Sequence, residues 1–264
     1  TKAFHGRTLA TLSAGDNEAY RTGFGPRPGG FQHVAFGNMN EMRAAMDDTV
    51  AGIMVEPVQG EGGINVADTD YLNELRVVAD EFGALLVFDE VQCGMGRTGK
   101  LWAHEAANIK PDVMALAKGL GGGFPVGAVL ATEKAASGMV PGTHGSTYGG
   151  NPLAVSVANA VLDVMLEDGF LDEVAAKGDY FMGRLAKIAA ANPKVLKGVR
   201  GKALMIGLEC EVTNADLQTK LRDAGILAVG AADNVLRFLP PLTITRDEID
   251  EALAIFEKVV SDWS

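Results

Sequence analysis

Three charged residues each stand at the end of a short apolar run: Glu56, Asp89 and Lys118. The intervals between them are 33 and 29 residues, each about the length of one strand-helix-strand crossover. Because ligands of open α/β sheets bind beyond the carboxyl ends of parallel strands, two acids and one amine are predicted to converge on one site there. A structural interpretation is also open: Asp89 caps the turn after it, and Lys118 extends its amine to water.

The elements that would position these residues alternate from about residue 50 onward, a pattern typical of a mostly parallel sheet covered by helices. In the helix at 68–83, an apolar face recurs at helical spacing, and Gly83 follows as a terminator. Asn151 and Pro152 suit the start of a long apolar helix that ends near Gly169. The predicted strands are 51–57, 85–90, 112–118 and 128–132, and the other predicted helix is 101–109. The apolar face of the first helix comprises Tyr71, Leu72, Leu75, Val78, Ala79 and Phe82.

A second, smaller α/β lobe is predicted toward the C-terminus. We place the boundary near residue 168, which divides the chain into a large domain, 1–168, and a small domain, 169–264. The small domain is predicted to contain helices at 170–191 and 215–225, strands at 203–209, 226–229 and 235–238, and a final amphipathic helix from Asp247.

Composition narrows the class of protein. The chain has 264 residues, 47% of them hydrophobic, and a formal charge of -11, which disfavours nucleic acid and anionic membranes as partners. No stretch approaches the roughly 18 apolar residues of a membrane span, and the first residues do not resemble a secretory signal. Cys93 and Cys210 are too few and too far apart for a disulfide framework. We therefore interpret both as free thiols and predict a reducing, cytoplasmic location.

Four longer stretches resemble the class III aminotransferases (subgroup II), which use pyridoxal phosphate on the aspartate-aminotransferase fold (fold type I). They are LLVFDEVQCGMGRTGKLWAHE, PDVMALAKGLGGGFPVGAVLAT, HGSTYGGNPLA and VLRFLPPL, and with FHGRT at residue 4 they follow the family order along the chain. Within the family, FHGRTLATLSA, GFGP and VEPVQGEGGI are most similar to the acetylornithine enzymes. The ornithine and succinylornithine enzymes share most of these motifs.

The resemblance implies two catalytic residues. Asp89 would lie against the pyridine nitrogen of pyridoxal phosphate and favour its protonated form, which accepts electron density from a developing carbanion. Lys118 would form a Schiff base with the cofactor, which requires an amine whose pKa is lowered by burial or by neighbouring positive charge. Lys100 and Lys110 are the competing lysines, but neither stands at the end of a predicted strand.

The remaining site residues are also implied by the resemblance. Gln92 would hydrogen-bond the phenolic oxygen of the cofactor, while Val91 and Phe4 would cover the two ring faces, with His5 beside them. Ser146 and Thr147 would bind the phosphate across a dimer interface, so a homodimer is expected.

Two arginines are the candidates for binding substrate carboxylates. The resemblance implies that Arg7 would hold the carboxylate of the ω-amino substrate and Arg237 that of glutamate or 2-oxoglutarate, with Glu61 as a gate that neutralises Arg237. The implied reaction moves the terminal amino group of N2-acetylornithine to 2-oxoglutarate.

Three alternatives stay open at this stage. The chain could act on ornithine or succinylornithine, or it could be a non-catalytic fragment. Family members extend well over a hundred residues further at the N-terminus, where their phosphate-binding loop lies, so we expect upstream sequence to be missing here. The third alternative, a nicotinamide-dependent enzyme, is supported only by the glycine-rich turn after Lys118. This turn lacks the strand and helix context of a dinucleotide-binding motif. The four histidines are scattered singly, so no metal site is predicted.

Overall fold

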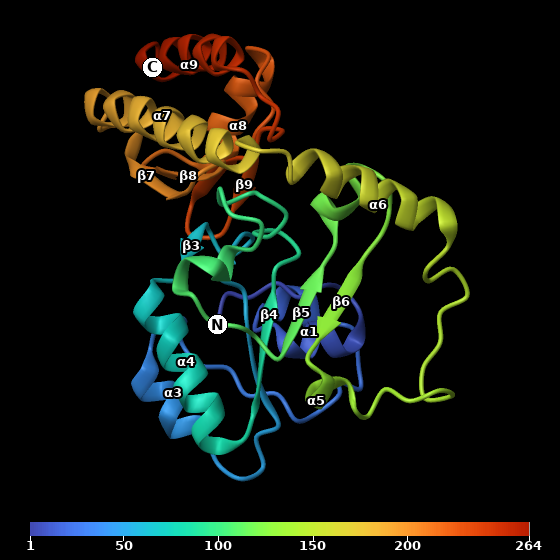
Figure 1. Ribbon diagram of the computed structural model, residues 1–264. Coiled ribbons are helices and arrows are strands. Elements are labelled where there is room, and N and C mark those ends of the chain that lie inside the picture. Colours follow the sequence, from blue (N-terminus) through green and yellow to red (C-terminus); the bar gives the residue numbers. More distant parts are fainter. Residues whose placement is uncertain (264) are drawn as a thin grey trace.

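The structure is a computed structural model that describes residues 1–263 of the chain. Its first sheet has four strands in the order β1-β4-β5-β6. Figure 1 shows β4, β5 and β6 side by side. β1, β4 and β5 pair in parallel, and β6 pairs antiparallel with β5. The predicted mostly parallel α/β sheet is therefore confirmed. The strands are β1 Gly52–Val55, β4 Leu85–Asp89, β5 Val113–Leu116 and β6 Ala128–Ala131.

The parallel register explains why the charged residues gather at one edge. Val55 lies opposite Phe88, so that Glu56 and Asp89 leave their strands at the same level. Asp89 in turn lies opposite Ala115 of β5, and Lys118 follows that strand. The convergence of two acids and one amine at the carboxyl ends of neighbouring strands, predicted from their spacing, is thus observed.

The two faces of this sheet are covered by other elements to different extents. Side chains alternate along each strand, and the side chains of Ile53, Leu86 and Phe88 are buried against α3 and α4. The opposite face carries Asp89 together with apolar side chains, of which Val129 is 71% exposed. This second face is therefore only partly covered by the described residues. The helices are α3 Met39–Ala45 and α4 Thr69–Phe82.

Helix α4 forms as its sequence predicts. The Asp68 side chain accepts a hydrogen bond from Tyr71 N at 2.6 Å, which satisfies a free amide of the first turn. Gly83 closes the helix at φ 67°, a left-handed conformation that glycine adopts without strain. The predicted apolar face is buried except for Phe82, the last helical residue, which is exposed.

The shorter elements of the first part connect this sheet to the rest of the chain. The predicted helix at 101–109 is a single 3-10 stretch, and a second 3-10 stretch begins at Lys118. The bounds are α1 Leu9–Ala14, α2 Glu18–Arg21, β2 Val58–Gln59, β3 Asn65–Val66, η1 Ala103–Ala107, η2 Lys118–Gly121 and α5 Glu133–Ala136.

Two consecutive helices lead to the second sheet. Asn151 caps α6 by accepting a hydrogen bond from Ala154 N at 2.9 Å, with Pro152 at the first helical position, as predicted. The helix ends at Met165, before the predicted end near Gly169, and Gly169 instead precedes α7. The domain boundary near residue 168 stays a prediction; it falls in the turn between α6 Pro152–Met165 and α7 Phe170–Ala191.

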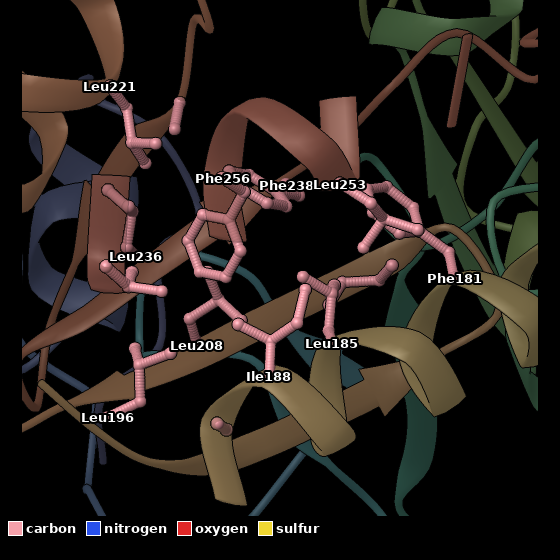
Figure 2. Close-up of a cluster of buried hydrophobic side chains, with 14 of the residues drawn as sticks. Phe181, Leu185, Ile188, Leu196, Leu208, Leu221, Leu236, Phe238, Leu253 and Phe256 are labelled. Carbon is pink, nitrogen blue, oxygen red and sulfur yellow. The ribbon is translucent and has the colours of Figure 1, made fainter. Parts of the chain in front are cut away.

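The second sheet is antiparallel, in the order β7-β8-β10-β9. One core joins it to α7, α8 and α9, and in this core Phe238 of β10 packs against both Phe181 of α7 and Phe256 of α9 (Figure 2). Strand β7 was not predicted because its sequence, LKGVRGK, buries only Leu196 and contains no apolar run. The bounds are β7 Leu196–Lys202, β8 Met205–Cys210, α8 Asn214–Asp223, β9 Val229–Ala231, β10 Val235–Phe238 and α9 Arg246–Ser261.

No helix within residues 1–263 combines the length and apolar character that crossing a membrane requires.

Candidate active site

Asp89 is buried at the end of β4 and held by two partners. His5 Nδ1 lies 2.8 Å from Asp89 Oδ2, and Val91 N donates to Oδ1 at 3.0 Å. Only 8% of the Asp89 side chain and 2% of the His5 side chain are exposed. His5 Nδ1 can donate to this carboxylate, which only accepts hydrogen bonds when it is ionised. The contact fixes the orientation of the carboxylate from a segment 84 residues away.

Glu56, at the end of the neighbouring strand β1, is also buried. Its Oε1 accepts from Phe4 N at 2.8 Å and its Oε2 from Gly60 N at 3.3 Å. Burial raises the pKa of Glu56 to about 7, although both hydrogen bonds oppose this shift. Through these two hydrogen bonds, the Glu56 side chain joins the Phe4 segment to the loop that carries Glu61.

Arg237, Glu61 and Gln92 form one hydrogen-bonded network. Arg237 Nη1 donates to Glu61 Oε1 at 2.7 Å, and Nη2 donates to Glu61 Oε2 at 3.0 Å, which is a bidentate pair. Gln92 accepts from Arg237 Nη1 at 3.2 Å and donates to Glu61 Oε1 at 3.3 Å. Burial opposes ionisation of Glu61, but the bonds and charge of Arg237 outweigh it and lower the pKa of this carboxyl group. Glu61 and Arg237, which the family resemblance predicts to interact, are thus in direct contact.

Gly60 allows this network to form. A Cβ atom at position 60 would lie 1.9 Å from Gln92 Oε1, a distance at which the two residues would collide. Glycine is therefore the residue that lets the 60–63 loop approach Gln92 and bring Glu61 to Arg237.

Lys118 lines the same cavity as this network, a volume of about 920 Å³. Its wall combines Lys118, Gln92, Glu61 and Arg237 with apolar side chains of α6 and the glycine-rich turn. The backbone at Lys118 has φ 39°, in the left-handed region that is strained for a lysine and recurs at functional sites. Of the two conditions expected to lower the pKa of the amine, burial is not observed, because Lys118 is exposed.

Arg7 takes a different position from Arg237. It is exposed, and its guanidinium carbon lies 3.7 Å from the ring centre of Tyr20 and 5.4 Å from that of Phe4. Phe4 and Tyr20 meet edge to face, with ring centres 6.1 Å apart. The segment that contributes His5 to Asp89 therefore also presents an arginine over two aromatic rings.

The structure does not bring every predicted residue to the cavity. Ser146 and Thr147 lie in the exposed loop between α5 and α6, where Ser146 Oγ accepts from Gly149 N at 3.0 Å, and they do not line the cavity of Lys118. Val91 is half-buried beside Asp89. Asp89 itself is on the adjacent strand rather than in the cavity wall.

Two buried residues near the site, Glu90 and Cys93, have structural rather than catalytic features. Glu90 accepts from Ala103 N at 2.7 Å and from His104 N at 2.9 Å, and so holds η1 in place. Cys93 is fully buried, and burial raises the pKa of its thiol, which is the opposite of activation.

Sequence reasoning missed three features of the site. The pairing of His5 with Asp89, the contact of Glu56 with Phe4 N, and the stacking of Arg7 on Tyr20 all join distant segments. The position of Glu56 at a strand end was a usable signal for the second contact. No local pattern marks Tyr20.

Comparisons with known proteins identify the family of this chain. The family model for class III aminotransferases matches residues 1–260. The chain is 55% identical to an acetylornithine aminotransferase of Mesorhizobium japonicum over 95% of its length, and 53% identical to one of Brucella melitensis over 99%. It spans 63% and 65% of the length of these two relatives.

Solved structures of aminotransferases are also similar to this chain. An ornithine aminotransferase from Toxoplasma gondii, described with partial occupancy of pyridoxal phosphate, superposes on 98% of this chain with a TM-score of 0.94 at 33% identity. The N-acetylornithine aminotransferase of Stenotrophomonas maltophilia covers 88% with a TM-score of 0.80 at 36% identity. The chain spans 63% and 62% of these proteins. Because the family model matches almost the whole of it, the chain belongs to the class III aminotransferase family.

Proposed function

We propose that the protein transfers the terminal amino group of N2-acetylornithine to 2-oxoglutarate, giving N-acetylglutamate 5-semialdehyde and glutamate, a step of arginine biosynthesis. The observation that carries this proposal is the bidentate Glu61–Arg237 pair in the cavity that Lys118 lines. An arginine that a movable carboxylate can neutralise suits a site that accepts two substrates of different charge in turn. The two acetylornithine aminotransferases at 53% and 55% identity support the choice of substrate.

The residues present fit pyridoxal phosphate as the cofactor. Asp89 is a buried carboxylate oriented by His5, which suits a protonated ring nitrogen. Phe4 and Val91 would cover the ring and Gln92 would hydrogen-bond its phenolic oxygen. When bound, the cofactor supplies an electron sink for the negative charge that develops on the amine-bearing carbon.

Lys118 Nζ has two roles in this proposal. Its amine would hold the cofactor, and as a free base it would move the proton at the substrate carbon that bears the transferred amine. Its place after β5, next to the glycine-rich turn, lets it reach the cavity without a bulky neighbour.

The two arginines divide the recognition of carboxylates. Arg7 would bind the carboxylate of N-acetylornithine, and its guanidinium has no acidic partner among residues 1–263. Arg237 would bind the carboxylate of 2-oxoglutarate or glutamate after Glu61 moves away. One cavity can then serve both half-reactions.

We also propose a homodimer in which Ser146 and Thr147 of one subunit contact the cofactor phosphate of the other. Both residues lie in an exposed loop, and the adjoining elements expose apolar side chains that a second copy would cover: Val129, Met139, Val140, Tyr148 and Leu153. A cytoplasmic location fits the free thiols Cys93 and Cys210.

Reduction with borohydride in the presence of pyridoxal phosphate, followed by peptide mapping, tests the assignment of the lysine. We expect the cofactor to be fixed on Lys118, and Lys118→Arg to abolish labelling. A label on Lys100 or Lys110 would refute the proposed mechanism. The absence of any labelling would instead favour a non-catalytic chain.

Substrate choice requires a separate measurement, because the structure with a TM-score of 0.94 is an ornithine aminotransferase. Turnover of N-acetylornithine, N-succinylornithine and ornithine should be compared with 2-oxoglutarate as acceptor. We expect the highest kcat/KM for N-acetylornithine. A higher kcat/KM for ornithine would indicate that the protein acts as an ornithine aminotransferase.

A further inference from the structure

Arg7 is held in place without being neutralised. Its guanidinium carbon lies 3.7 Å from the centre of the Tyr20 ring, and its side chain forms no ion pair within residues 1–263. The nearest acid on α2, Glu18, instead pairs with Arg21 and Arg27, at 3.7 and 3.5 Å. Among residues 1–263, the positive charge of Arg7 therefore has no acidic partner.

The geometry of stacking leaves a defined part of the guanidinium available. A cation that lies over an aromatic ring uses its face, while its N–H groups point outward in the guanidinium plane. Those edges are the part that binds a carboxylate through two parallel hydrogen bonds. Tyr20 thus occupies the face of Arg7 and leaves the carboxylate-binding edges open.

Arg237 differs from Arg7 in its exposure and in its hydrogen-bond partners. Arg237 is 3% exposed, and its Nη atoms are taken by Glu61, Gln92 and the Gly230 carbonyl. A carboxylate can reach Arg237 only after Glu61 moves. At Arg7, no acidic side chain of the described residues has to be displaced first. The two arginines are therefore prepared for binding in two different ways.

We propose that Tyr20 is a positioning residue that sets the affinity for the distal carboxylate of the amino donor, by stacking on Arg7. The substrate class is an ω-amino acid whose carboxylate lies at the end away from the reacting amine. This inference rests on the proposed function, since it assigns the bound carboxylate to the donor of that reaction.

A double-mutant cycle on the loaded enzyme tests the inference. Tyr20→Leu should raise KM for N-acetylornithine about three- to tenfold, the range expected for loss of one cation–π contact, with little change in kcat. Tyr20→Phe keeps the ring and should retain the wild-type KM. In the Arg7→Ala background, Tyr20→Leu should add almost nothing, because its effect passes through Arg7.

Tyr180→Leu is the matched control. Tyr180 stacks on Arg246 at the same distance of 3.7 Å, but in the small lobe. Removal of that ring should leave KM unchanged. If Tyr20→Leu and Arg7→Ala instead act additively, or if Tyr20→Phe is as impaired as Tyr20→Leu, the inference is wrong. Tyr20→Gln serves as a second variant if Tyr20→Leu does not fold.

A readout without turnover separates this inference from the proposed function. In side-chain NMR spectra, the Arg7 Nε–H signal, assigned by its loss in Arg7→Lys, should be displaced by the Tyr20 ring current. The displacement should disappear in Tyr20→Leu and persist in Tyr20→Phe. Titration with N-acetylornithine should move this signal in the wild type and require higher concentrations in Tyr20→Leu. An enzyme that shows these shifts but transfers no amine would contradict the proposed function alone, whereas an unshifted Arg7 signal would contradict the stacking.

Discussion

His5 Nδ1 lies 2.8 Å from Asp89 Oδ2, and both side chains are almost completely buried. The pair joins the first residues of the described chain to the end of β4. It leaves the carboxylate with a single orientation at the edge of the sheet, where Val91 N binds the other oxygen. A buried and oriented charge acts more strongly on a bound cofactor than a solvated one.

Asp89→Asn is expected to remove nearly all transamination while the fold is retained. The amide keeps the shape of the side chain but removes the negative charge that favours a protonated ring nitrogen. Turnover should be compared with thermal unfolding of the same sample. Full activity in this variant would contradict the proposed role of the carboxylate, and Asp179→Asn, on α7 of the small lobe, provides a charge-matched control.

Arg237→Lys is expected to raise KM for 2-oxoglutarate by about tenfold or more, because a lysine cannot replace a bidentate hydrogen-bonded pair. KM for N-acetylornithine should change much less. Steady-state kinetics with each substrate varied in turn measures the two constants. Arg184→Lys, whose partner Asp250 is near the surface, is the control. An equal rise in both constants would argue against separate arginines for the two substrates.

Glu56 is expected to make stability depend on pH. Its folded-state pKa of about 7 is higher than the ordinary value of 4.5, so the folded chain keeps this proton longer than the unfolded chain does. The stabilising effect is therefore complete below pH 4.5 and is lost as the pH rises through 7, by about 3 kcal/mol for a shift of this size.

Glu56→Gln removes this titration. The free energy of unfolding of the variant, relative to that of the wild type, should rise between pH 4.5 and pH 7 and then level off. Denaturant titrations at several pH values measure the difference. A gap that stays constant across this range would show that Glu56 is ionised in the folded protein throughout.

Phe256→Ala is expected to cost about 3–5 kcal/mol of stability, since its ring is completely buried and packs edge to face on Phe238, with centres 5.5 Å apart. Leu227→Ala should change stability by less than about 0.5 kcal/mol, because Leu227 is 86% exposed. Chemical denaturation followed by circular dichroism compares the two. Similar losses would mean that the core shown in Figure 2 does not dominate the stability of the second sheet.

Much of the fold could be predicted because its signals are local. Helix α7 was expected at 170–191 and is observed at those residues, and α4 ends at the predicted Gly83. Capping and helical periodicity involve residues three or four positions apart, so the sequence carries them directly. Strand β7 escaped detection because its place in the sheet depends on pairing with β8 rather than on apolar side chains of its own.

The sequence by itself determined the apolar strands, the charged residues at their ends and the family motifs around Asp89, Lys118 and Arg237. Only the tertiary structure decided the partners of these residues. His5 reaches Asp89 across 84 positions, and Gln92, which was expected at the cofactor, reaches Arg237 across 145. Such contacts depend on the path of the whole chain and on which buried charges must be paired, and no local pattern of residue types encodes either.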